Sequence, residues 1–174
     1  MIDRPGREIR RFPADKAPAA ARAIGQVLDE IQADASCIAI CGGACGGDLL
    51  FAESALRRGC SIRLYLPFAR DAFIKASVDI AGGDWLRRFE TIERLAEREF
   101  IADASPDDPE AFADNNLRML SAAREAGGGA SAFYLTCLWD GLEGDGRGGT
   151  ADMIRQAAKS GAIVSCIDPH KLDG

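Results

Sequence analysis

The chain has 174 residues, 47% of them hydrophobic and 28% charged, which is typical of one globular domain and excludes a largely disordered chain. Its net charge of −6 argues against binding to nucleic acid, which requires clustered Lys and Arg to displace counterions. No apolar run reaches the ~18 residues of a membrane span and the N-terminus has no signal-peptide core, so we expect a cytoplasmic protein that engages no membrane.

Strand-like and helix-like segments alternate along the chain. Apolar residues at helical spacing predict a helix over 16–34, and the wholly apolar run at 37–41 is typical of a buried parallel strand. The elements that follow are a helix at 48–58, a strand at 61–67, helices at 71–77 and 84–98, a strand at 99–103, a helix at 109–126, a strand at 131–140, a helix at 150–160 and a strand at 162–168. This alternation predicts a single α/β domain over 1–174, a Rossmann-like doubly wound parallel sheet of about five strands with helices on both faces.

Six cysteines occur, at positions 37, 41, 45, 60, 137 and 166. Without a secretory signal we expect them to be reduced, and four of them fall in apolar runs, where Cys serves as a small buried hydrophobe. Cys41 and Cys45 have a spacing found in metal sites, but the only histidine is His170, so the ligand count favours no metal.

Two glycine-rich segments follow strands and open helices. In a doubly wound sheet such segments meet at the carboxyl edge, where ligands bind. Helix starts present unpaired N–H groups and partial positive charge, and glycine lets a phosphate approach them. The predicted ligand-binding residues are Gly42, Gly43, Ala44, Cys45, Gly46, Gly47 and Asp48 in the first loop and Asp140, Gly141, Gly146, Gly148, Gly149 and Thr150 in the second. The alternative is that the glycines only make tight turns, and that Asp48 only complements its helix dipole.

Known phosphate-binding motifs fit in part. A Walker loop requires Lys and then Ser or Thr after its last glycine, where this chain has Asp48 and Leu49. The dinucleotide fingerprint matches at Gly144-x-Gly146-x-x-Gly149, but it lies in the last unit of the chain with no separate catalytic domain. The first observation disfavours a P-loop ATPase, and the second disfavours a dehydrogenase.

The combined pattern of both loops resembles the SLOG superfamily, the Rossmann-like group that includes the LOG phosphoribohydrolases, and is close to bacterial domains associated with TRAFs-binding-domain proteins. The matching stretches are 1–7, 11–13, 44–53, 66–68, 77–78, Trp85, 88–89, Asn116, 119–120, 138–146 and 148–150. The resemblance implies an apolar strand before Met1, which would bring Asp3, Arg4, Arg7 and Arg11 to the ligand edge.

The resemblance also implies two alternative functions. LOG enzymes cleave the base–ribose bond of a nucleotide with a Glu in the helix after the second loop, where this chain has Met153. The remaining carboxylates there, Asp140, Asp145 and Asp152, are the candidate catalytic groups. Because the expected Glu is missing, we favour a sensor or regulatory domain that binds AMP, ADP-ribose, NAD or a cyclic nucleotide.

Two further residues are candidate ligand contacts. Arg88 suits bidentate binding of phosphate, and Asn116 lies within a helix, where Asn is mildly unfavourable. The alternative for both is exposure to solvent. Since the chain carries no effector of its own, we expect a homodimer or higher oligomer that signals to an effector protein.

Overall fold

The computed structural model describes residues 1–100, 104–128, 133–143 and 146–173, and within them the chain is a mixed α/β structure. The elements in chain order are η1 (Ala14–Lys16), α1 (Ala17–Glu30), β1 (Ile38–Cys41), α2 (Gly47–Leu56), β2 (Ser61–Leu66), α3 (Arg70–Phe73), η2 (Ile74–Val78), η3 (Asp79–Ala81), α4 (Trp85–Leu95), β3 (Glu97–Phe100), α5 (Ala111–Ala126), β4 (Tyr134–Leu138), α6 (Thr150–Lys159), β5 (Ile163–Ile167) and η4 (Pro169–Lys171).

The strands form two small parallel sheets, and the single five-stranded sheet expected from the sequence is not seen in these ranges. One sheet has the order β1-β2-β3, and the other consists of β4 and β5. The first strand pair is in register from Ile38 opposite Ser61, and the second sheet from Tyr134 opposite Ile163. The parallel direction is as predicted, because a helix follows each of β1, β2 and β4 and returns the chain to the start of the next strand.

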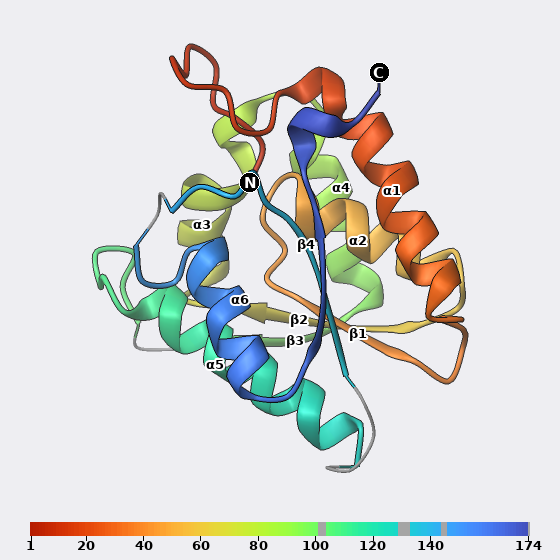
Figure 1. Ribbon diagram of the computed structural model, residues 1–174. Coiled ribbons are helices and arrows are strands. Elements are labelled where there is room, and N and C mark those ends of the chain that lie inside the picture. The colour runs from red at the N-terminus through yellow and green to blue at the C-terminus, as the bar shows by residue number, and fades with distance from the viewer. Residues whose placement is uncertain (101–103, 129–132, 144–145, 174) are drawn as a thin grey trace.

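Helices join the two sheets into one body. The β4–β5 pair runs between α5 and α6 on one side and α1 and α2 on the other (Figure 1). Helix α1 contacts both β4 and β5, whereas α5 contacts β1 and β2. Leu138 and Ile167, near the carboxyl ends of β4 and β5, pack against the main core, so apolar burial holds the second sheet to the first. A smaller cluster around Leu120, Phe133 and Ala157 fills the space between α5, α6 and the second sheet.

Two helices differ from the sequence prediction. The expected helix at 71–77 is a short α-helix that widens into the π-helical turn η2. The expected helix at 84–98 ends at Leu95, because Glu97–Phe100 pairs with β2 instead, with Arg63 opposite Glu97. Pairing with a neighbouring strand here overrides the helical preference of the local sequence.

The first thirteen residues lie against the domain as an ordered segment. Ile2 and Phe12 are buried in the main core, and the carboxylate of Asp3 accepts hydrogen bonds from the backbone N–H groups of Arg11 and Phe12. This segment is therefore a closed loop whose two ends meet at Asp3. Within the described part of the chain, no helix is both long enough and apolar enough to cross a membrane.

Candidate functional site

The N-terminal segment contacts both glycine loops, which brings all three to the same edge of the molecule. The Ile2 N–H donates to the Cys45 carbonyl at 3.0 Å, and Arg11 binds Asp140, two residues after β4. The first loop also touches the second sheet directly, because a Cβ at Gly47 would lie 3.5 Å from Leu138 Cδ1. The two loops are thus neighbours, as the predicted site requires.

In the first loop, backbone N–H groups point to acceptors within the protein. The Ala44 N–H donates to Asp48 Oδ2 at 3.1 Å, and the Cys45 N–H donates to the Ser77 carbonyl at 2.8 Å. Burial raises the pKa of the Asp48 carboxyl group, and the amides of Ala44, Gly42 and Gly43 act in the opposite direction. The carboxylate of Asp48 therefore occupies the position that an external anion would take in this loop.

Gly46 is required by the close approach of the N-terminal segment. Its φ of +99° lies in the region that favours glycine, and a Cβ would stand only 2.7 Å from the Ile2 backbone nitrogen. Backbone conformation and crowding therefore explain the glycine at position 46 without a ligand.

In the second loop, Asp140 is held by a guanidinium. Arg11 donates from Nε and Nη2 to the two carboxylate oxygens at 2.6 and 2.8 Å, and the Leu142 N–H donates to Oδ1 at 3.0 Å. The Asp140 side chain is only 2% exposed. The hydrogen bond from Arg11 lowers the pKa of Asp140 to about 2, so the group is fully ionised at neutral pH.

The start of α6 is fixed in a similar way. Asp152 accepts a hydrogen bond from the Gly148 N–H at 3.0 Å, which lowers the pKa of its carboxyl group. Asn116 on α5 donates to the Gly148 carbonyl at 3.0 Å, so this predicted ligand contact positions the loop. A Cβ at Gly148, whose φ is +81°, would stand 2.8 Å from the Ala113 backbone nitrogen.

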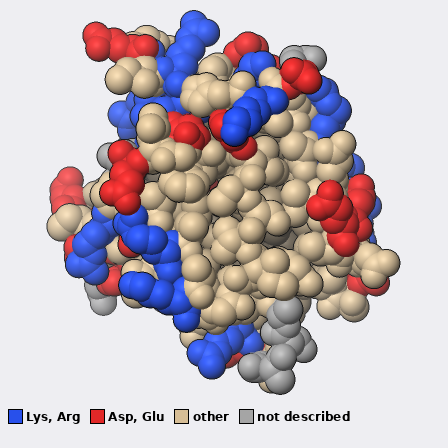
Figure 2. Space-filling model, in the orientation of Figure 1, with Lys and Arg blue, Asp and Glu red and all other residues tan. Residues whose placement is uncertain are grey.

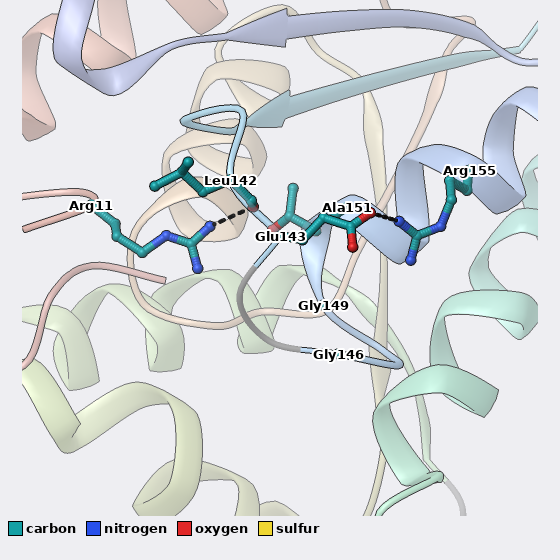
Figure 3. A pocket seen from close by; sticks show the side chains of 8 residues that line it. Arg11, Leu142, Glu143, Gly146, Gly149, Ala151 and Arg155 are labelled. Atoms are coloured by element: carbon teal, nitrogen blue, oxygen red, sulfur yellow. Dashed lines mark hydrogen bonds and ion pairs between the residues drawn. The ribbon is translucent and has the colours of Figure 1, made fainter. Parts of the chain in front are cut away.

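A hollow of about 30 Å³ lies at the beginning of α6. It is lined by Arg11, Leu142, Glu143, Gly146, Gly149, Thr150, Ala151 and Arg155. Figure 3 shows Arg11 and Arg155 on opposite sides of it, with the Leu142–Glu143 stretch between them. Arg155 Nη1 lies 2.6 Å from Glu143 Oε1, and both side chains are largely exposed. The first N–H groups of α6 have no intrahelical acceptor, so two guanidiniums and a helix N-terminus converge on one small space.

The other predicted residues have different surroundings. Arg88 donates to both carboxylate oxygens of Glu53 at 2.7 and 2.6 Å and lies 4.2 Å from the Trp85 ring centre, so it ties α4 to α2. Gly141 has a φ of +81°, and a Cβ there would have no atom of the described residues within 4 Å, so its backbone conformation rather than crowding favours glycine. Asp145 lies outside the described residues.

Four residues that line the hollow were not among the predicted site residues: Leu142, Glu143, Ala151 and Arg155. Arg155 follows Thr150 by five positions, and Arg at this distance from a glycine loop is a weak signal, because most helical arginines are solvated. Arg11 was expected at the ligand edge, and its contact with Asp140 across 129 positions is visible only in the fold.

Comparison with known proteins gives no further assignment: the chain matches no protein-family model and shows no significant similarity to a curated protein.

Proposed function

We propose that the protein binds a phosphate-bearing nucleotide, with the phosphate at the N-terminus of α6. The observation that supports this most is the hollow beside Gly149, Thr150 and Ala151, which the exposed guanidinium of Arg155 borders on one side and the Arg11 guanidinium, held by Asp140, on the other. Helix N-termini bind anions through free N–H groups, and guanidinium groups match phosphate in geometry and charge. This arrangement favours an anion over a neutral ligand.

The size of the hollow limits what enters it. A volume of about 30 Å³ has room for roughly two water molecules, since one needs about 10–15 Å³ by this measure. Two oxygen atoms of a phosphate group fit this scale, and a whole nucleotide does not. The sugar and base would then lie outside, along the stretch that holds Leu142 and Glu143.

The first loop has a supporting role in this proposal, because its amides already bind Asp48 and Ser77. Among the described residues that line the hollow, Glu143 alone carries a carboxylate, and its side chain is 80% exposed and able to move away. An incoming phosphate would replace Glu143 as a partner of Arg155, which also lies 3.6 Å from Asp152 Oδ1. The proposed site therefore exchanges an ion pair within the protein for one between protein and ligand.

Asp140 and Asp152, the two candidate carboxylates among the described residues, fit a regulatory role better than general-acid catalysis of hydrolysis. A general acid must hold a proton near neutral pH, whereas the pKa values of Asp140 and Asp152 are both lowered. Both groups are also engaged, with Arg11 and with the Gly148 N–H. We therefore propose a SLOG-like sensor in a Rossmann-like setting that passes its signal to an effector, and hydrolysis of an N-glycosidic bond is the alternative.

Thermal unfolding with AMP, ADP-ribose, NAD and cyclic nucleotides tests the proposal. A ligand at 100 times its dissociation constant stabilises the folded state by about 2.7 kcal/mol, which is about 5–10 °C for a chain of this size. Arg155→Gln should remove the shift. The matched control is Arg147→Gln, since Arg147 is exposed, pairs with Glu110 and does not line the hollow.

Two outcomes count against the proposal. No shift with any of these compounds, or equal shifts in wild type and Arg155→Gln, would contradict a phosphate site at α6. Release of free base from AMP or NAD, measured by chromatography, would favour the hydrolase instead.

A further inference from the structure

Two cysteines face each other across the second sheet. Cys137 of β4 and Cys166 of β5 are direct partners in the parallel register, and their sulfur atoms lie 3.5 Å apart. Neighbouring strands are about 4.8 Å apart, which is within the Cα–Cα range that a disulfide spans. Both thiols are free in this structure, so closing the bond requires the sulfur atoms to approach to about 2.05 Å.

The two thiols differ in their surroundings. Cys166 is exposed, contrary to the expectation that it is a buried hydrophobe, whereas Cys137 is half-buried. Burial raises the pKa of the Cys137 thiol, and the neighbouring Cys166 adds to this. Cys166 is therefore the thiol that an oxidant reaches first, with Cys137 placed behind it.

The side of the molecule on which β5 lies has an uncharged centre. In the orientation of Figure 1, β5 lies in front of β4, and Figure 2 shows that the described residues in the middle of this face include no Lys, Arg, Asp or Glu. Charged side chains gather at its rim. A small uncharged oxidant such as hydrogen peroxide meets no charged side chain of the described residues in the middle of this face (Figure 2).

We propose that Cys137 and Cys166 form a redox-active pair that closes to a disulfide when a peroxide oxidises Cys166. The Cys166 thiolate attacks one oxygen of hydrogen peroxide, the O–O bond breaks, and the hydroxide that leaves takes up a proton to become water. Cys166 is then a sulfenic acid. The Cys137 sulfur, losing its proton, attacks the Cys166 sulfur; the S–O bond breaks and a second water leaves. In total, two thiols and one peroxide give one disulfide and two waters.

The position of the pair connects it to the loop before α6. Cys137 lies three residues before Asp140, and the Trp139 N–H donates to the Ile167 carbonyl at 2.9 Å. A covalent link between β4 and β5 at this level would fix the two strand ends from which the Asp140 loop departs. The redox state of the pair would in this way be sensed at the mouth of the candidate site.

Peroxide treatment of the full chain, followed by alkylation and peptide mapping by mass spectrometry, tests the proposal. Wild type should lose two of its six thiols and yield one linked peptide pair containing Cys137 and Cys166, and dithiothreitol should restore both thiols. Cys137→Ser should stop at a sulfenic acid on Cys166 that dimedone traps. Cys166→Ser, which changes an exposed side chain, should leave Cys137 fully alkylatable.

Cys37 and Cys60 provide the matched control. They directly precede β1 and β2. Burial raises the pKa of Cys60 and the nearby Cys37 adds to this, but no contact between their sulfur atoms is seen among the described residues. Cys60→Ser should leave the linked pair unchanged. A wild-type protein in which Cys166 oxidises while Cys137 stays alkylatable would overturn the proposal, as would equal loss of all six thiols.

Discussion

The ion pair between Arg11 and Asp140 should be a principal anchor of the N-terminal segment. Replacing Asp140 with Asn removes the charge that accepts two hydrogen bonds from Arg11, in a place where the side chains are only 17% and 2% exposed. Arg11 would keep its charge without this carboxylate, and leaving one member of a largely buried pair alone is costly. We therefore expect Asp140→Asn to destabilise the whole domain.

The pKa of Asp140 sets the size of the effect. The shift from the ordinary value of 3.8 to about 2 corresponds to about 2 kcal/mol at 1.36 kcal/mol per unit. Because the pKa is lowered in the folded state, this stability is fully present above pH 4 and is lost as the pH falls from about 4 to about 2. At neutral pH the loss corresponds to a fall in the unfolding temperature of about 4–8 °C.

Urea unfolding of a double-mutant cycle measures the coupling energy between Arg11 and Asp140. Asp140→Asn, Arg11→Gln and the double variant at pH 7 should give a coupling energy of about 2 kcal/mol. The control cycle is Arg63 with Glu97, a pair whose side chains are 35% and 75% exposed and whose coupling energy should stay below about 1 kcal/mol. Equal coupling energies in both cycles would refute the reasoning. So would an Asp140→Asn variant whose free energy of unfolding falls below pH 4 as steeply as that of wild type.

Three further changes test the loops. Gly148→Ala should cost at least about 2 kcal/mol in urea unfolding, because its φ is +81° and the new Cβ would stand 2.8 Å from the Ala113 backbone nitrogen. Glu143→Gln should tighten AMP or ADP-ribose binding about threefold to fivefold in calorimetry, because it frees Arg155 from an exposed ion pair. Asp48→Asn should gain stability over wild type as the pH rises from 4 to 7, because burial raises the pKa of Asp48 and its ionisation costs free energy.

Matched controls separate these effects from general damage. Gly128→Ala, at a φ of +69°, meets no atom of the described residues within 4 Å and should cost only about 1 kcal/mol. Glu110→Gln breaks the exposed pair with Arg147 away from the hollow and should leave nucleotide affinity unchanged. A Glu110→Gln variant that tightens binding as much as Glu143→Gln would contradict the role given to Glu143. A pH-independent difference between wild type and Asp48→Asn would contradict the role given to Asp48.

The alternation of apolar runs with helical periodicity was enough to place most of the elements. Strand β1 lies within the apolar run 37–41, and helix α6 begins at Thr150 as predicted from the glycines before it. What the local pattern does not contain is pairing between distant segments. The end of the helix at Leu95 and the division into two sheets both depend on which strand edges meet.

The sequence predicts where the two glycine loops lie in the fold, but it does not predict which of their N–H groups are available to a ligand. The glycine pattern identified two loops, and the structure brings them to one edge through Ile2 and Arg11. The same pattern does not say whether the N–H groups of a loop are available. In the first loop they bind Asp48, which lies only four residues after Ala44, and this closure depends on how the carboxylate folds back.

The most direct test of the phosphate site is a titration of the ¹⁵N-labelled protein with ADP-ribose, followed by amide chemical shifts. If a phosphate binds at the start of α6, the N–H groups of Thr150 and Ala151 should show large, saturable shifts, with those of Ala44 and Cys45 little changed. Shifts that centre on Ala44 and Cys45, or an unaffected start of α6 at saturating ligand, would contradict this prediction.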